Sequence, residues 1–301
     1  MEPSQSKIAG FFLIISMLLP LCAQASEEVD INLSVSLLQE ENINRGFFET
    51  DVHEDQVTQF TAGLKTELEI NRLSAFFISI DYIDRSYSDY DKLSSSQFTG
   101  RVDYVFQTGY RFSNPSYTLS FSIDESDYGS LLRDSTTLSL SAKMLKRFTT
   151  RIKLSTGLAL IEREADTNVF DIETTRLFVL LDYSITPKWS LYGSAALHDG
   201  GSVSTITTTD PDLLAQQIGY ATVNEADAAG ALLPDDAFGG AVAGQFAYQN
   251  NAETTILELG TNYILASRQS VDFSMQTIST SLDTGLEYDN FLLQLSYLAR
   301  F

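Results

Sequence analysis

The sequence predicts an all-β protein, a transmembrane antiparallel up-and-down β-barrel of about 12 strands with both termini on the periplasmic side. Three observations lead to this prediction. Apolar and polar side chains alternate every second residue through most of the chain, short and long connections alternate between these segments, and the apolar N-terminal segment is too short to cross a bilayer. One apolar and one polar strand face fit lipid outside and water inside.

The last strand, Tyr288 to Phe301, shows this pattern at its clearest. Its apolar face consists of Phe291, Leu293, Leu295, Tyr297, Ala299 and Phe301. Its other face offers amides, a hydroxyl and a charge, including Gln294, Ser296 and Arg300. A half-buried strand of a soluble sandwich has the same alternation, so the remaining segments are needed to decide between the two folds.

Eleven further segments repeat the two-faced pattern. They are Val29 to Leu37, Phe60 to Ile70, Phe76 to Tyr82, Phe98 to Phe106, Tyr117 to Ile123, Leu138 to Met144, Ile152 to Leu160, Leu177 to Tyr183, Trp189 to Leu197, Leu257 to Leu265 and Val271 to Thr277. With the last strand the total is even, as in bacterial single-chain barrels whose termini share one side of the membrane.

The connections between these segments give an independent indication. If the first strand runs outward, the inner turns fall at 71–72, around 113–115, at 146–147, at 186–188 and at 267–268. The outer connections fall near 39–56, 84–95, 125–135, 163–172, 199–252 and 280–287, and they are rich in Asp and Glu. Short periplasmic turns and long extracellular loops are typical of outer-membrane barrels.

Residues 1–25 are predicted to be a secretory signal peptide, which leaves 26–301 as the barrel. Lys7 precedes an apolar core from Ile8 to Leu21, and Ala23-Gln24-Ala25 supplies the small residues of a cleavage site. Cleavage would remove Cys22, which is the one cysteine of the chain. We therefore expect an exported protein without disulfides.

The net charge of −21 argues against nucleic acid as a partner, because polyanion binding requires a basic surface. We also expect no cofactor and no dedicated metal site. The acidic outer loops could hold divalent cations loosely, since hard cations prefer clustered carboxylates, and such cations would bridge to lipopolysaccharide.

The inward face carries the candidate pore residues. They are Lys65, Glu67, Asp81, Arg101, Asp103, Asp124, Lys143, Lys153, Arg176, Asp182, Glu258, Asp272 and Arg300. Both signs occur, and no continuous basic ladder is present. The charges could pair across a filled interior, or they could line a narrow polar channel that selects small solutes.

The long extracellular loop at about 199–252 has an unusual composition for a solvated loop. Its apolar stretches include Leu213-Leu214-Ala215 and Ala229-Gly230-Ala231-Leu232-Leu233. Long loops without structure are uncommon unless they are functional or disordered. We expect either that part of this loop folds into the mouth and constricts it, or that it forms an outward hairpin.

An enzyme is not expected. The sequence does contain Asp89-Tyr90-Asp91 and Asp51-Val52-His53, which resemble the acid pairs of the omptin proteases, where a histidine activates water. The two pairs occur in the opposite chain order from that family, and they lie in loops where such pairs arise by chance. An omptin-like outer-membrane protease is therefore a remote alternative.

With its signal peptide, its strand rhythm and its terminal Tyr297-Leu298-Ala299-Arg300-Phe301, the chain resembles the porin-like superfamily of Gram-negative outer-membrane β-barrels. The resemblance implies an outer-membrane location among lipid and lipopolysaccharide. It also implies that Tyr297 and Phe301 form the signal read by the outer-membrane insertion machinery. More narrowly, Glu41-Asn42-Ile43-Asn44-Arg45 is similar to uncharacterised barrels linked to exopolysaccharide or surface-protein export, which implies periplasmic export components as partners.

Two functions follow as hypotheses. The first is a restricted passive channel, or an export-pathway pore, for small polar or sugar-like solutes. The alternative is a non-conducting structural or interaction barrel with acidic surface loops.

Overall fold

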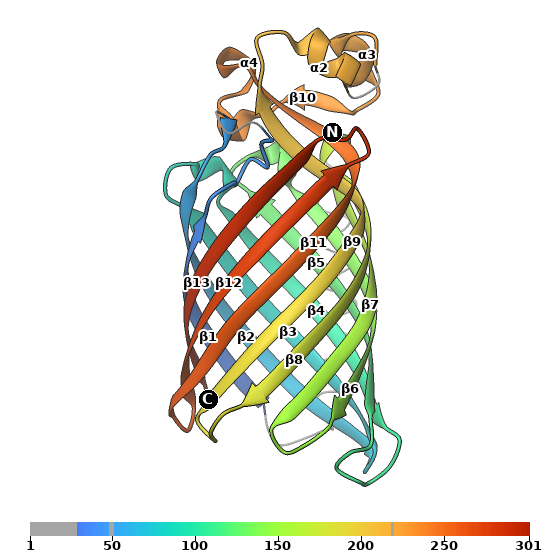
Figure 1. Cartoon of the computed structure of the whole chain (residues 1–301), viewed down its shortest axis with the longest axis vertical. Helices are drawn as coiled ribbons and strands as arrows, with labels where there is room; N and C mark the ends of the chain where they lie inside the picture. Colours follow the sequence, from blue (N-terminus) through green and yellow to red (C-terminus); the bar gives the residue numbers. More distant parts are fainter. Residues whose placement is uncertain (1–28, 48–50, 218–219) are drawn as a thin grey trace.

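Twelve antiparallel strands form a closed barrel in the computed structural model, which describes residues 29–47, 51–217 and 220–301 (Figure 1). The first six strands are β1 (Val29–Glu40), β2 (Asp55–Asn71), β3 (Ser74–Tyr87), β4 (Ser95–Gln107), β5 (Ser116–Tyr128) and β6 (Ser135–Arg147). The others are β7 (Ile152–Ala165), β8 (Ile172–Ser184), β9 (Trp189–Thr207), β11 (Gln245–Ala266), β12 (Gln269–Leu282) and β13 (Glu287–Arg300). The predicted antiparallel β-barrel of about twelve strands is confirmed.

The barrel closes between its first and last strands. β1 and β13 are antiparallel, with Asn32 opposite Arg300 and Leu38 opposite Gln294. On the inward face of this seam the hydroxyls of Ser36 and Ser296 share a hydrogen bond of 2.8 Å. Closure satisfies the backbone groups of strands that would otherwise be edges, which a bilayer requires.

The outer face of the barrel is apolar, as the alternation predicts. Leu37, Leu259 and Tyr297 are exposed there, and so are large apolar residues at alternate positions of the other strands, such as Phe121, Leu140 and Leu158. Exposed apolar surface on this scale is unfavourable in water and is typical of contact with hydrocarbon.

Small residues on the inner face make room for larger inward neighbours. Gly260 lies opposite Tyr192 across β9 and β11, and a Cβ there would come 2.2 Å from the Tyr192 ring. Gly157 lies opposite Phe178 in the same way, with 2.7 Å to the ring. Each ring therefore lies flat across a glycine of the adjacent strand, and it projects less into the lumen.

The end of the barrel that holds Val29 and Arg300, here called the turn end, has mostly short connections. They are residues 72–73, 108–115, 148–151, 185–188 and 267–268. The second is longer than the turn predicted around 113–115, because β4 ends at Gln107 and β5 begins at Ser116. Connection length therefore alternates less strictly than the sequence indicates.

The opposite end carries the connections 41–54, 88–94, 129–134, 166–171, 208–244 and 283–286. The second, third and fourth each contain a 3₁₀ turn, which are η2 (Asp91–Leu93), η3 (Leu131–Arg133) and η4 (Asn168–Phe170). The fifth connection, residues 208–244, is called the cap. It contains α2 (Pro211–Gln217), α3 (Val223–Ala228), β10 (Leu232–Pro234), η5 (Asp236–Phe238) and α4 (Gly240–Ala243).

The loop predicted at about 199–252 is too long at both ends. β9 continues to Thr207 and β11 begins at Gln245, so the two strands pair beyond the predicted rim as a hairpin extension, 199–207 with 245–253. Residues 202–206 are buried on both faces, and Val203, Thr205 and Ile206 are β-branched residues that favour such a strand. The irregular connection is therefore 208–244.

The predicted signal peptide, residues 1–25, lies outside the described residues. Among the helices of the described part, none has the length and apolarity needed to cross a lipid bilayer.

Candidate functional site

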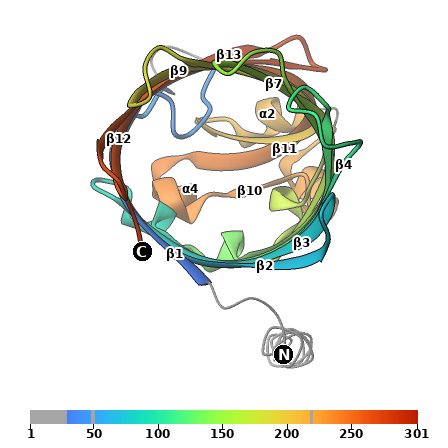
Figure 2. The same ribbon diagram turned by 90° about the horizontal axis from the view of Figure 1, so that it is seen from below.

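The lumen and the cap over its mouth form the candidate site. Strand alternation places all of the predicted pore residues on the inner face of the barrel. Seen along the barrel axis, α2, α4 and β10 lie within the circle of strands (Figure 2). Anything passing through the lumen would therefore meet the cap.

Some of the predicted pore residues are paired with other inward groups. Arg101 donates to Asp103 at 2.7 Å and to Ser120 at 3.1 Å, and Arg300 forms an ion pair with Asp30. The acids on other strands accept from neutral groups. Asp124 accepts from Thr99 at 2.5 Å, Glu258 from Ser194 at 3.1 Å and Asp272 from Tyr192 at 2.8 Å.

The remaining predicted residues have looser surroundings. The Lys65 ammonium lies 4.5 Å from the centre of the Phe77 ring, and Asp81 lies over Gly63, where its carboxylate would contact an added Cβ. Lys153 is directly opposite Asp182 between β7 and β8. Glu67 is a further inward acid on β2. The interior thus mixes ion-paired charges with charges that form no ion pair among the described residues, and neither predicted extreme describes it alone.

Cavities occupy parts of this lumen. One of about 400 Å³ is lined by Arg101, Lys143, Arg176 and Glu258 together with several serines. A second, of about 490 Å³, lies near the turn end beside Asp81 and Arg300. A third, of about 250 Å³, lies toward the capped end and is lined by Glu40, Arg45, His198 and residues of β11 to β13. We call the last one the subcap chamber.

The cap has an apolar core of its own. On one face of the β9–β11 extension, Ile206, Phe246 and Tyr248 pack with Leu214 of α2 and Leu232 of β10. On the other face, a second cluster combines Val203, Leu233 and Ala247 with Val169 and Phe170 of η4. The apolar stretches of the loop sequence are explained by this packing, because the cap is built around a hairpin that is buried on both sides.

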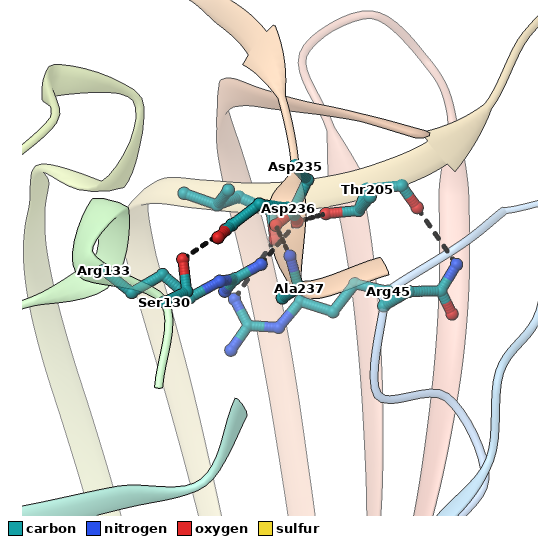
Figure 3. Close-up of polar contacts among 9 residues, drawn as sticks. Arg45, Ser130, Arg133, Thr205, Asp235, Asp236 and Ala237 are labelled. Carbon is teal, nitrogen blue, oxygen red and sulfur yellow. Dashed lines mark hydrogen bonds and ion pairs between the residues drawn. The ribbon is translucent and has the colours of Figure 1, made fainter. Parts of the chain in front are cut away.

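A buried aspartate fastens the cap to the barrel rim (Figure 3). Asp235, directly after β10, is fully buried and accepts hydrogen bonds of 2.5 Å from both Arg133 and Thr205. Its other oxygen accepts from the backbone N–H of Ala237 at 3.1 Å. Arg133 also lies over the Phe170 ring, 4.4 Å from its centre. Three parts of the chain thus converge on one carboxylate, as a buried charge requires.

The neighbouring Asp236 makes a second attachment. It accepts from Ser130, and from Lys92 at 3.0 Å. Burial raises the pKa of Asp236, but the hydrogen bonds from Ser130 and Lys92 and the nearby charges of Lys92 and Arg133 outweigh it, so the pKa lies below the ordinary value of 3.8. These contacts favour the ionised form of the carboxyl.

The first long connection binds the base of the cap. Thr207 donates its backbone N–H to Asp51 at 2.7 Å, and Asn44 donates to the Thr205 carbonyl at 3.0 Å. Arg45, at φ 55°, is the one non-glycine residue of the described chain with positive φ, an arrangement that costs about 1–2 kcal/mol. The backbone N–H of Gly46 donates to the Asn42 side chain at 2.8 Å and so stabilises the turn that contains Arg45. Arg45 also lines the subcap chamber.

No family model and no curated relative matches the sequence. Solved structures resemble the chain in fold. An outer-membrane channel from Pseudomonas putida F1 is 13% identical, with a TM-score of 0.54, over 92% of this chain and 97% of that chain. The NanC porin is 7% identical with a TM-score of 0.46, over 89% and 98%. The translocator domain of the NalP autotransporter from Neisseria meningitidis is 9% identical with a TM-score of 0.42, over 98% of each chain.

The chain folds as an outer-membrane β-barrel. The likeness to the Pseudomonas channel, together with the closed twelve-stranded sheet, supports this statement. At 13% sequence identity, the similarity to this channel is a similarity of fold alone.

The residues proposed for a protease do not form a water-activating pair in this barrel. His53 Nδ1 shares a hydrogen bond of 2.9 Å with the Tyr90 hydroxyl, and its ring stacks on Phe238 at 5.6 Å. The carboxylate of Asp51 is occupied by Thr207. Among the described residues no carboxylate accepts a hydrogen bond from His53, whose partners Tyr90 and Phe238 belong to the cap attachment, so this corner gives the protease alternative no support.

Within 29–47, 51–217 and 220–301, no group of three or more His, Cys, Asp and Glu side chains is placed to hold a metal ion. The barrel's cap attachment was missed from the sequence. Arg133, Thr205 and Asp235 lie far apart in the chain, and nothing in their spacing indicates that they meet. The apolar stretches of the loop were the available signal, and they predicted packing without naming its partners.

Proposed function

We propose that this protein is an outer-membrane channel for small polar solutes in which the cap restricts one mouth. The observation that carries the proposal is the combination of a polar, hollow lumen with a structured insertion across its end. The apolar outer face fits a bilayer, and the inner face offers charges of both signs around cavities of several hundred Å³.

The lumen suits restricted passage. Paired charges such as Arg101 with Asp103 line the wall, while Tyr192 and Phe178 lie flat against it over Gly260 and Gly157. A channel of this kind favours small hydrophilic molecules by size and charge. Passage in the outward direction, as part of an export pathway with periplasmic components, belongs to the same proposal.

In this proposal the apolar belt contacts outer-membrane lipid and lipopolysaccharide. The cap lies on the extracellular side and both termini lie on the periplasmic side, because the short connections gather at the turn end. Tyr297, exposed on β13, and Phe301, exposed directly after it, serve as the assembly signal for the insertion machinery.

The non-conducting alternative is favoured by the firm attachment of the cap. Asp235 is buried in an ion pair, and two apolar clusters hold the β9–β11 extension. A cap that never opens would leave a structural or interaction barrel, which would present acidic loops to a partner.

Planar-bilayer recording separates the two functions. Residues 209–243 would be replaced by a short Gly-Ser linker, which leaves β9 and β11 intact, and the control would shorten the connection 108–115 at the turn end. We expect small single-channel steps for the complete protein and several-fold larger steps for the cap deletion. Equal single-channel conductance of the two proteins would overturn the restriction by the cap. Absence of conductance from both proteins would overturn the channel function.

A further inference from the structure

Two inward cations, on β6 and on β8 with β7 between them, take part in no ion pair among the described residues. Arg176 on β8 and Lys143 on β6 line the same cavity of about 400 Å³. Among the described residues the lumen ion pairs join Arg101 to Asp103 and Arg300 to Asp30, and neither Arg176 nor Lys143 takes part in one. A guanidinium inside a protein normally has a carboxylate or hydrogen-bond acceptor in reach.

Arg176 contacts an aromatic ring but has no hydrogen-bond acceptor among the described residues. Its guanidinium lies 5.5 Å from the centre of the Phe178 ring, and that ring is kept flat by Gly157 beneath it. Ala159, directly opposite Arg176 on β7, has a small side chain, and both residues line the cavity of about 400 Å³. Arg176 Nε is buried without a hydrogen-bond partner in the described chain.

A second polar group lies beside it. His198 is directly opposite Arg176 across β8 and β9, on the same inward face. Its Nε2 is also buried without a partner in the described chain. His198 lines the subcap chamber and Arg176 lines the larger cavity, so the pair stands where the two spaces adjoin.

The surrounding wall offers hydroxyl groups and one acid. Ser139, Ser141, Ser155 and Ser194 line the cavity, and each hydroxyl can donate to or accept from a polyhydroxylated ligand. Glu258 is the one acid among the lining residues, and its carboxylate is engaged by Ser194 at 3.1 Å without an ion pair to Arg176. The local charge is therefore positive, although the whole chain carries −21.

We propose that Arg176, Lys143 and His198 form an oxyanion-binding site on the permeation path, which takes small hydroxylated solutes that bear a carboxylate or a phosphate. The guanidinium and ammonium supply charge-assisted hydrogen bonds, and the serines contact the hydroxyls of the ligand. The site deepens the proposed channel function, since it would give that channel a preference for anionic solutes.

Calorimetry on the folded, detergent-solubilised full-length barrel in 0.15 M NaCl tests the site. Glucuronate carries the carboxylate, glucose 6-phosphate carries the phosphate, and neutral glucose is the comparison. We expect at least one of the two anions to bind and glucose to give no heat. Arg176→Gln and Lys143→Gln should each weaken binding about tenfold, because a charge-assisted hydrogen bond is lost. Glu258→Gln should tighten it by removing the opposing charge.

Lys153→Gln is the matched control, because it removes the same charge from a lumen position outside the cavity. Heat-modifiable migration on gels verifies that each variant is folded. Absence of anion binding to the complete protein, or equal weakening by Lys153→Gln, would overturn the site. Calorimetry needs no solute to pass through the barrel, so a failed channel proposal and a failed binding site give different results.

Discussion

Arg133 donates to Asp235 at 2.5 Å across the mouth of the barrel, and it joins the connection between β5 and β6 to the end of β10. The Asp235 side chain is fully buried and that of Arg133 is 16% exposed, so little water screens the pair. This contact is the point at which the cap and the barrel depend on each other most directly.

Asp235→Ala should loosen the cap without unfolding the barrel. Removing one partner leaves Arg133 desolvated and unpaired, which destabilises the docked cap by about 3 kcal/mol. Hydrogen exchange of β10 and limited proteolysis of 208–244 should both speed up. Asp227→Ala, at an exposed position on α3, is the control and should change neither. Unchanged protection in the Asp235 variant would show that the apolar clusters suffice to hold the cap.

The attachment through Asp236 should weaken in acid. The folded-state pKa of this carboxyl is lowered, so its stabilisation is complete above the ordinary value of 3.8 and is lost as pH falls through the lower folded-state pKa. Proteolysis of the cap by an acid-active protease should accelerate below about pH 4. Asp236→Asn should remove this part of the pH dependence, and an identical pH profile for the two proteins would contradict the assignment.

Gly260→Ala should displace the Tyr192 ring into the lumen. The new Cβ would come 2.2 Å from Tyr192 Cζ, and the side chain can escape only by giving up its bond of 2.8 Å to Asp272. We expect the free energy of unfolding to fall by about 1 kcal/mol. On gels, the folded form should convert to the unfolded form at a lower temperature. Tyr192→Phe should cost a similar amount, and the double variant should cost little more, because both remove the same bond. Gly201→Ala has its nearest neighbour at 3.5 Å and is the control; strictly additive losses would refute the coupling.

Deleting Phe301 should impair assembly of the barrel. The residue exchanges two backbone hydrogen bonds with Ile31, of 3.2 and 2.8 Å, at the seam that closes the sheet, and its exposed ring is part of the proposed insertion signal. The amount of heat-modifiable protein in the membrane should fall several-fold, while Phe112→Ala, an exposed aromatic in the connection 108–115, should have no effect. Normal levels after the deletion would remove Tyr297 and Phe301 from the assembly signal.

Strand number, strand direction and the two faces of the wall were predictable because they are local properties. A period of two along the chain determines which side chains face together, and closure of a membrane sheet follows from the need to satisfy every backbone group. The sequence therefore determined that Arg176 and Lys143 face the lumen and that Leu259 and Tyr297 face outward.

Tertiary structure alone decided which of these inward charges have partners and where the cap lies. Arg101 has Asp103 two residues away on its own strand, whereas Arg176 faces Ala159 and His198 on strands brought alongside by the barrel. Asp235, Arg133 and Thr205 meet although long stretches of chain separate them. Such contacts depend on the packing of distant segments into one volume, and side-chain periodicity carries no information about that packing.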